Sequence, residues 1–269
     1  MGRELALELA LFAGALVSAL FGYGGQLFPP PPFEPGARED GTLRVVTWNV
    51  GGARGGELHG LRDADAPHVA SVLRALAPDV AVLQEVGSRA AADELARALG
   101  SGWEARRGAG GLTVLAREAE LDRARRVRGV GRALVVELRW RGLEVALAGV
   151  HADAFDPEER NEEVGRTAER LFDERADLHL LLGDLNLDVD LDKKRDLFSS
   201  QVHLDVETYN FVADRLRDAA SGRGATAEPD RRLDYVFVSR SARVEAAGPW
   251  KGQRVGTMDH DPVVADVLP

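Results

Sequence analysis

The chain has 269 residues, enough for one large domain or two small ones, and its 45% hydrophobic and 29% charged content is ordinary for a soluble globular protein. The formal net charge of −10 argues against binding of long nucleic acid through charge alone. It does not exclude a phosphate-bearing substrate, because a bound divalent cation reverses the local field. The sequence has no cysteine, which excludes disulfides, zinc–thiolate sites and cysteine nucleophiles.

The first forty residues differ in composition from the rest. Residues 5–21 are apolar apart from Glu8 and Ser18, and a proline run follows at 29–32. The apolar stretch is short for a membrane span and has little positive charge before it, so it is read as an export signal, an N-terminal anchor or a helix packed on the domain. We therefore expect a hydrophobic segment at 1–28, a stiff Pro-rich linker at 29–41 and one folded domain at 42–269. A signal or anchor predicts export or membrane association through residues 5–21, and a packed helix predicts a cytoplasmic protein.

From residue 42 onward, apolar runs bounded by Gly, Pro and polar residues alternate with segments of helical periodicity. The predicted strands are 43–50, 80–85, 112–116, 133–138, 143–150, 178–183, 233–238 and 263–267. The predicted helices are 66–77, the segment capped by Ser88 and ending at 99, 157–175, and 208–220.

The central stretch is residues 180–186, an apolar run that ends in Gly183, Asp184, Leu185 and Asn186. Side chains two apart on an extended backbone point the same way, so Asp184 and Asn186 are predicted side by side at the end of a buried strand. The alternative interpretation is a turn in which both residues bond their own backbone.

Five predicted strands end or begin in residues that bind metals or move protons: Asn49, Glu85, His151, Asp184 with Asn186, and Asp259 with His260. Each alone has a structural explanation such as a turn cap, a solvated strand end or a satisfied histidine. Their joint placement favours one site. Carboxylate and carboxamide oxygens without thiolates suit Mg²⁺, with Mn²⁺ as the other candidate, and leave histidine free for proton transfer or phosphate contact.

Six segments resemble, in order and spacing, the endonuclease/exonuclease/phosphatase superfamily. They are residues 47–50, 83–86, 150–151, 183–186, 232–235 and 259–260, and the resemblance covers about residues 43–268. It implies an α+β fold, a four-layer α/β/β/α sandwich of two packed, mainly antiparallel sheets. It also implies a divalent-metal-dependent phosphoester hydrolase, most simply a monomeric phosphodiesterase or nuclease that uses in-line attack by water.

The resemblance also implies roles for the residues that match its motifs. Asn49, Glu85 and Asp259 would hold the metal. Asp184 would orient or deprotonate the attacking water, and Asn186 would hold that water or a phosphate oxygen. His260 would be general base or transition-state stabiliser, Asp234 would fix its tautomer, and His151 would donate to a phosphoryl oxygen.

Departures from the family pattern bear on the substrate. Abasic-site endonucleases usually have tyrosine at the position of His151 and an acid just after the Asn49 motif, where this chain has Gly51 and Gly52. The basic cluster at 193–195 is interpreted as a solvated loop, with contact to a phosphate-rich substrate as the alternative. The substrate classes left open are nucleic acid and a phospholipid headgroup, as in a sphingomyelinase-like enzyme. A non-catalytic binding module that retains the fold is the alternative from another class.

Overall fold

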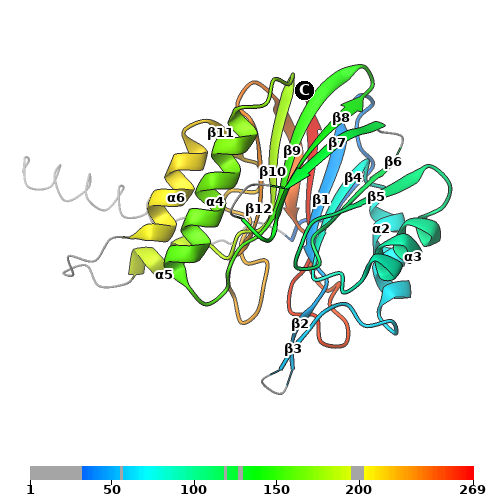
Figure 1. Ribbon diagram of the computed structural model, residues 1–269, viewed down its shortest axis with the longest axis horizontal. Coiled ribbons are helices and arrows are strands. Elements are labelled where there is room, and N and C mark those ends of the chain that lie inside the picture. The colour runs from blue at the N-terminus through cyan, green and yellow to red at the C-terminus, as the bar shows by residue number, and fades with distance from the viewer. Residues whose placement is uncertain (1–31, 55–56, 118–119, 127–129, 195–202) are drawn as a thin grey trace, which may run out of the picture. The chain divides into compact units, whose positions relative to one another are not determined.

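The computed structural model describes residues 32–54, 57–117, 120–126, 130–194 and 203–269. The predicted signal or anchor segment at 1–28 and Arg195 of the basic cluster lie outside these ranges. Residues 33–269 form one compact unit, and within it two six-stranded sheets pack face to face between two layers of helices (Figure 1). The α+β four-layer sandwich predicted from the sequence is confirmed.

The first sheet has the order β13-β14-β1-β4-β6-β5. Its strands are β1 (Leu43–Asn49), β4 (Val80–Gln84), β5 (Trp103–Arg107), β6 (Thr113–Arg117), β13 (Arg243–Pro249) and β14 (Val263–Leu268). β1 and β4 pair in parallel, and the other neighbours pair antiparallel.

The second sheet has the order β11-β12-β10-β9-β8-β7. Its strands are β7 (Glu120–Arg126), β8 (Ala133–Trp140), β9 (Leu143–His151), β10 (Leu178–Asp184), β11 (Leu216–Asp218) and β12 (Asp234–Ser239). β9 and β10 pair in parallel, and the remaining pairs are antiparallel. A small hairpin of β2 (Gly52–Arg54) and β3 (Glu57–His59) follows β1 directly.

The core lies in three layers that follow from the alternation of side chains along each strand. Between the sheets, Val45 and Val82 of the first sheet join Leu147 and Leu180 of the second in one buried cluster. Helices α2 (Ala66–Leu76) and α3 (Arg89–Leu99) cover the outer face of the first sheet. Helices α4 (Pro157–Phe172) and α6 (Leu204–Ala213) cover the second, and α5 (Val189–Lys194) lies at their end (Figure 1).

Two helix starts show the expected local chemistry. The Ser88 hydroxyl accepts a hydrogen bond from the Ala91 amide at 3.0 Å, as the sequence predicts. The Asp156 carboxylate accepts from the amides of Glu158 and Glu159 at the start of α4. The cap at Asp156 fixes the chain just after β9, and His151 is the last residue of β9.

The helix predicted at 208–220 is wrong at both ends. α6 runs from Leu204 to Ala213, and the chain then turns into the short strand β11, whose residues pair with β12. The apolar residues Leu216 and Ala220, which suggested a continuing helix, are buried against the second sheet instead. Pairing with an existing strand edge outweighs local helix propensity here.

Residues just before the predicted domain start also contact the domain. Phe33 packs against the cluster under α2 and α3, and the Arg38 guanidinium pairs with Asp79. Arg44, buried in β1, bonds both oxygens of Asp266 at 2.7 Å and the carbonyl of Gly36 at 2.9 Å. None of the helices in the described part of the chain is long and apolar enough to cross a membrane.

Candidate active site

The two parallel strand pairs bring polar residues to one end of the sandwich. In the first sheet, Asn49 ends β1 opposite Gln84, and Glu85 follows directly. In the second sheet, Asp184 ends β10 and is paired with His151 on one side and Asp234 on the other. Because parallel strands place their carboxyl ends at the same edge, residues far apart in sequence become neighbours there.

Asn49 connects the two sheets at this end. Its Nδ2 donates to Glu85 Oε1 at 3.0 Å and to Asp184 Oδ2 at 3.0 Å, while its Oδ1 accepts the amide of Gly51 at 3.0 Å. The amide orientation follows from this network, since only the nitrogen can donate to two carboxylates. Asn49 therefore acts as a donor between two acids in this structure, and its oxygen is occupied by the backbone.

Both carboxylates that Asn49 joins carry raised pKa values. Burial is the main cause for Glu85, and the nearby charge of Asp184 adds to it, against the hydrogen bond from Asn49. Burial also raises the pKa of Asp184, which is 1% exposed, while the charge of His260 opposes the change. Two carboxylates held together with little solvent are costly as a charged pair, and a cation between them would relieve that cost.

Position 51 lies so close to the Glu85 side chain that only glycine fits there. A Cβ at Gly51 would lie 1.8 Å from Glu85 Oε2 and 2.7 Å from the carbonyl oxygen of His59. Glycine at this position lets the start of the β2–β3 hairpin pass close to the carboxylate. The glycine that directly follows the motif at residues 47–50 thus has a steric reason.

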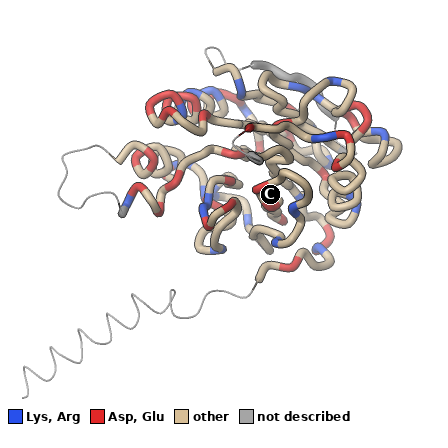
Figure 2. The backbone as a smooth tube through the Cα atoms, turned by 90° about the horizontal axis from the view of Figure 1, so that it is seen from below, with Lys and Arg blue, Asp and Glu red and all other residues tan. Residues whose placement is uncertain are grey.

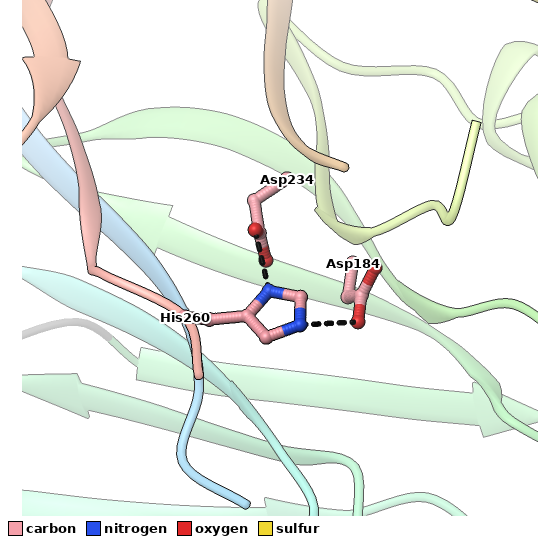
Figure 3. Close-up of side chains that lie close together, drawn as sticks. All are labelled: Asp184, Asp234 and His260. Carbon is pink, nitrogen blue, oxygen red and sulfur yellow. Dashed lines mark hydrogen bonds and ion pairs between the residues drawn. The ribbon is translucent and has the colours of Figure 1, made fainter. Parts of the chain in front are cut away.

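His260 lies between two acids of the second sheet, hydrogen-bonded to Asp234 and paired by charge with Asp184 (Figure 3). Its Nδ1 lies 2.7 Å from Asp234 Oδ2, and its Nε2 lies 3.7 Å from Asp184 Oδ2. Burial by itself would lower the pKa of His260, but the charges of Asp234 and Asp184 and the hydrogen bond to Asp234 outweigh it and raise the pKa to about 10. The imidazole is therefore protonated at neutral pH.

His151 lies close to Glu85 and Asp184. Its Nε2 is 3.7 Å from Glu85 Oε1 and 3.9 Å from Asp184 Oδ2. Burial is the main cause that lowers its pKa, and the charges of Arg132 and His260 lower it further. Its Nδ1 is buried and has no hydrogen-bond partner among the described residues. The two histidines thus differ: one is neutral and the other is charged.

Asn186 and Asp259 complete the residues predicted from the sequence. The Asn186 amide donates to Asp184 Oδ1 at 3.1 Å, and its side-chain Nδ2 donates to the Ala152 carbonyl at 2.9 Å. The strand interpretation is met for Asp184, which ends β10. It is not met for Asn186, which lies beyond the strand with φ +50°, where the second oxygen of Asp184 closes a turn. Asp259 Oδ1 lies 3.7 Å from His260 Nε2, and its carbonyl accepts the amide of Glu228.

Two supporting residues were missed by the sequence reasoning. The Trp48 Nε1 donates to the His260 carbonyl at 3.0 Å, and the Thr226 Oγ1 accepts the amides of Leu233 and Asp234 at 3.0 Å each. Trp48 lies inside a recognised motif and could have been found there. Thr226 lies in a polar loop without any periodic signal.

The site has the donor chemistry of a cation site. The ligand atoms of Asp184, Asp234 and His260 lie within 4.8 Å of one another, so this buried group could hold a metal ion. Asp234 Oδ2, however, is already hydrogen-bonded to a protonated imidazole, which is not a ligand. Glu85 Oε1 accepts the Asn49 amide and lies among the negative charges of Asp184 and Asp259, so it suits a hard cation better.

Solved structures share this fold. An endonuclease/exonuclease/phosphatase from Beutenbergia cavernae is 23% identical, covers 84% of this chain and 71% of its own, and has a TM-score of 0.62. A mannosyl-6-phosphatase of Bacteroides thetaiotaomicron is 17% identical over 84% of this chain and 100% of its own (TM-score 0.62). D. rerio TDP2 in complex with single strand DNA product is 16% identical over 85% and 99% (TM-score 0.61).

Curated proteins give no match to the chain. Residues 46–254 match the endonuclease/exonuclease/phosphatase family. That range begins within β1 and ends after Asp234, so it contains most of the strand ends described above. By this match over most of its length, and by the two packed sheets, the chain belongs to the endonuclease/exonuclease/phosphatase family.

Proposed function

We propose that the protein is a divalent-metal-dependent phosphoester hydrolase of the phosphodiesterase or nuclease type. The observation that carries the proposal is the joining of Glu85 and Asp184 by a single amide nitrogen, beside a protonated His260 held by Asp234. The partly buried Glu85 supplies a ligand for a hard cation, the buried Asp184 supplies a base for water, and the imidazolium supplies positive charge for a phosphoryl group.

Glu85 and Asp259 would hold Mg²⁺ or Mn²⁺, with Asn49 positioning Glu85. When bound, the cation would polarise a phosphoryl oxygen and neutralise charge that develops on phosphorus. The raised pKa of Asp184 suits it to accept a proton from the attacking water. Asn186 would hold that water or a phosphate oxygen.

The two histidines would divide the remaining work. A histidine with a pKa near 10 is a poor base at neutral pH, so His260 would stabilise the transition state rather than take the proton from water. His151, neutral because burial lowers its pKa, would donate a hydrogen bond to a phosphoryl oxygen without adding a fixed charge.

The test is hydrolysis of bis(p-nitrophenyl) phosphate by the purified full-length protein with Mg²⁺. Glu85→Gln keeps the shape of the side chain and should lower kcat/KM by at least about 100-fold, as should EDTA. Glu94→Gln, at an exposed position on α3, is the matched control and should leave the rate unchanged. Activity that survives both EDTA and Glu85→Gln would refute the proposal.

The substrate panel should contain both ester types. One fold neighbour is described with single strand DNA product and another as a mannosyl-6-phosphatase, so single-stranded DNA and sugar phosphates belong in the panel together with sphingomyelin. Binding of one of these without turnover, with every divalent metal offered, would favour the non-catalytic module.

A further inference from the structure

A pocket with a volume of about 490 Å³ opens directly beside Glu85. Its walls come from Gly60 after β3, from the segment after β4, and from the end of β5 with the loop that leads to β6. Most of the lining is glycine, and its charged side chains are Glu85 and Arg107. Its size is in the range of small-ligand sites. The wall is therefore mostly backbone, with one acid at the proposed metal centre and one cation.

The cation, Arg107, has donors to spare. Its Nη2 donates to the Val86 carbonyl at 2.9 Å, which fixes the guanidinium against the segment after Glu85. Its Nε is buried without a hydrogen-bond partner in the described structure, and no described acid forms an ion pair with it. A partly buried guanidinium with an unused donor is costly unless a ligand supplies an acceptor.

The neighbouring Arg106 makes a useful contrast. Successive side chains of a strand point to opposite faces, so Arg106 leaves β5 on the other side. It lies 3.3 Å from Glu104 in an ion pair, and its side chain is 42% exposed. Two adjacent arginines thus differ in that only Arg107 lines the pocket and lacks an acid.

The loop that carries the pocket wall is fixed to the proposed metal centre. The Val86 amide donates to the Gly111 carbonyl at 3.0 Å. Gly111 has φ +80°, and a Cβ there would lie 3.0 Å from backbone atoms of Glu85. Only glycine allows this approach, so Arg107 and Glu85 are held at a set separation.

We propose that Arg107 binds a second phosphate of the substrate, next to the phosphate that is hydrolysed. Its guanidinium would bind that phosphate through charge-assisted hydrogen bonds. The inference rests on the proposed function and narrows its substrate class to compounds with at least two phosphates. It disfavours a choline headgroup, because a cationic group would meet a cationic wall.

A binding measurement tests this contact separately from catalysis. Calorimetric titrations in Mg²⁺ use the Asp184→Asn background, in which turnover is removed, and compare thymidine 3′,5′-bisphosphate with thymidine 5′-monophosphate. The bisphosphate should bind about tenfold more tightly, the effect of one charge-assisted contact. Arg107→Gln should abolish this preference, and the matched change Arg106→Gln should preserve it.

A second pair of probes separates the two sources of a second phosphate. Inositol 1,4-bisphosphate and inositol 1-phosphate test whether a non-nucleotide frame is accepted. A preference for the bisphosphate in both pairs would show that the pocket accepts bisphosphates of either kind. A preference in one pair alone would restrict it to nucleotides or to inositol phosphates, respectively. The absence of an Arg107-dependent preference in both pairs would overturn the inference.

Turnover distinguishes failure of this inference from failure of the proposed function. Bis(p-nitrophenyl) phosphate has no second phosphate, so Arg107→Gln in the otherwise unchanged protein should lower its kcat/KM less than that of a substrate that carries a second phosphate. An equal loss on this substrate would assign Arg107 a structural role and overturn the inference. Hydrolysis absent in the unsubstituted protein would overturn the proposed function, while the titrations would still decide whether Arg107 binds phosphate.

Discussion

The hydrogen bond between Asp234 and His260 allows a quantitative test of the site. His260 is buried, and its pKa is raised from 6.5 to about 10 by three acids, Asp234, Asp184 and Asp259, of which Asp234 has the largest effect. That difference corresponds to a preference of roughly 5 kcal/mol for the protonated imidazole. Asp234→Asn keeps the size of the side chain and removes the charge, so the pKa of His260 should fall by about 1–3 units.

The measurement is an NMR titration of the histidine side chains in EDTA. The chain has six histidines, and the two proteins are compared on the assigned resonances of His260. An unchanged titration of His260 in Asp234→Asn would refute the electrostatic account of this pair.

The same shift has a consequence for stability. Because the folded-state pKa of His260 is raised, its contribution to the free energy of unfolding is fully present below about pH 6.5 and is lost as the pH rises through about 10. Asp234→Asn should move the upper limit of this window down. Urea unfolding in EDTA at several pH values measures it, and parallel curves for the two proteins would contradict the assignment.

Three further predictions concern the acids and their surroundings. Asp184→Asn should leave the thermal midpoint nearly unchanged and remove turnover of bis(p-nitrophenyl) phosphate; retained turnover would mean that Asp184 does not handle the water. Gly51→Ala should displace Glu85, cost about 1–3 kcal/mol in urea unfolding and weaken Mg²⁺ binding; unchanged Mg²⁺ affinity would exclude the steric argument. Mg²⁺ at about 100 times its Kd should add about 2.7 kcal/mol of stability, roughly 5–10 °C by scanning calorimetry, and Glu85→Gln should remove the increment; an increment that persists in that variant would place the ion elsewhere.

Much of the fold is readable from the sequence because the central strands are apolar on both faces. Strands such as β4 and β10 are buried between a second sheet and a helix layer, so their sequences are continuous apolar runs. The missed strands differ: β5 reads Trp-Glu-Ala-Arg-Arg and is half-exposed, and β13 lies at a sheet edge. Edge strands are specified by their partners and carry weak local patterns.

The members of the site were predicted, but not how they are connected. Asn49 was assigned as a metal ligand by resemblance, and whether it binds metal stays a prediction. The structure adds that its nitrogen faces Glu85 and Asp184, which depends on a contact between sheets that no local pattern encodes. The difference in pKa direction between His151 and His260 likewise depends on burial and on neighbours supplied by the fold.

The charge pattern of the sequence was also of limited use for predicting the site. Figure 2 shows acidic and basic positions interspersed along the described backbone, and in that view the basic positions form no continuous stripe. The sequence could argue against binding of long nucleic acid by charge alone, but it could not distinguish Arg106 from Arg107. That distinction required the side chains and the pocket beside Glu85.

Because Asn49 bonds to both sheets, the geometry of the site depends on how the two sheets are stacked. Glu85 belongs to one sheet and Asp184 to the other, and a single side chain holds both at 3.0 Å. The layer of apolar side chains between the sheets, Val82 and Leu180 among them, acts as the spacer behind this contact. A change in that layer would tilt or slide one sheet on the other and would reach the two acids as a change of separation. Residues that never meet the substrate would in this way tune the rate, and variants selected for core packing alone would alter catalysis as a by-product.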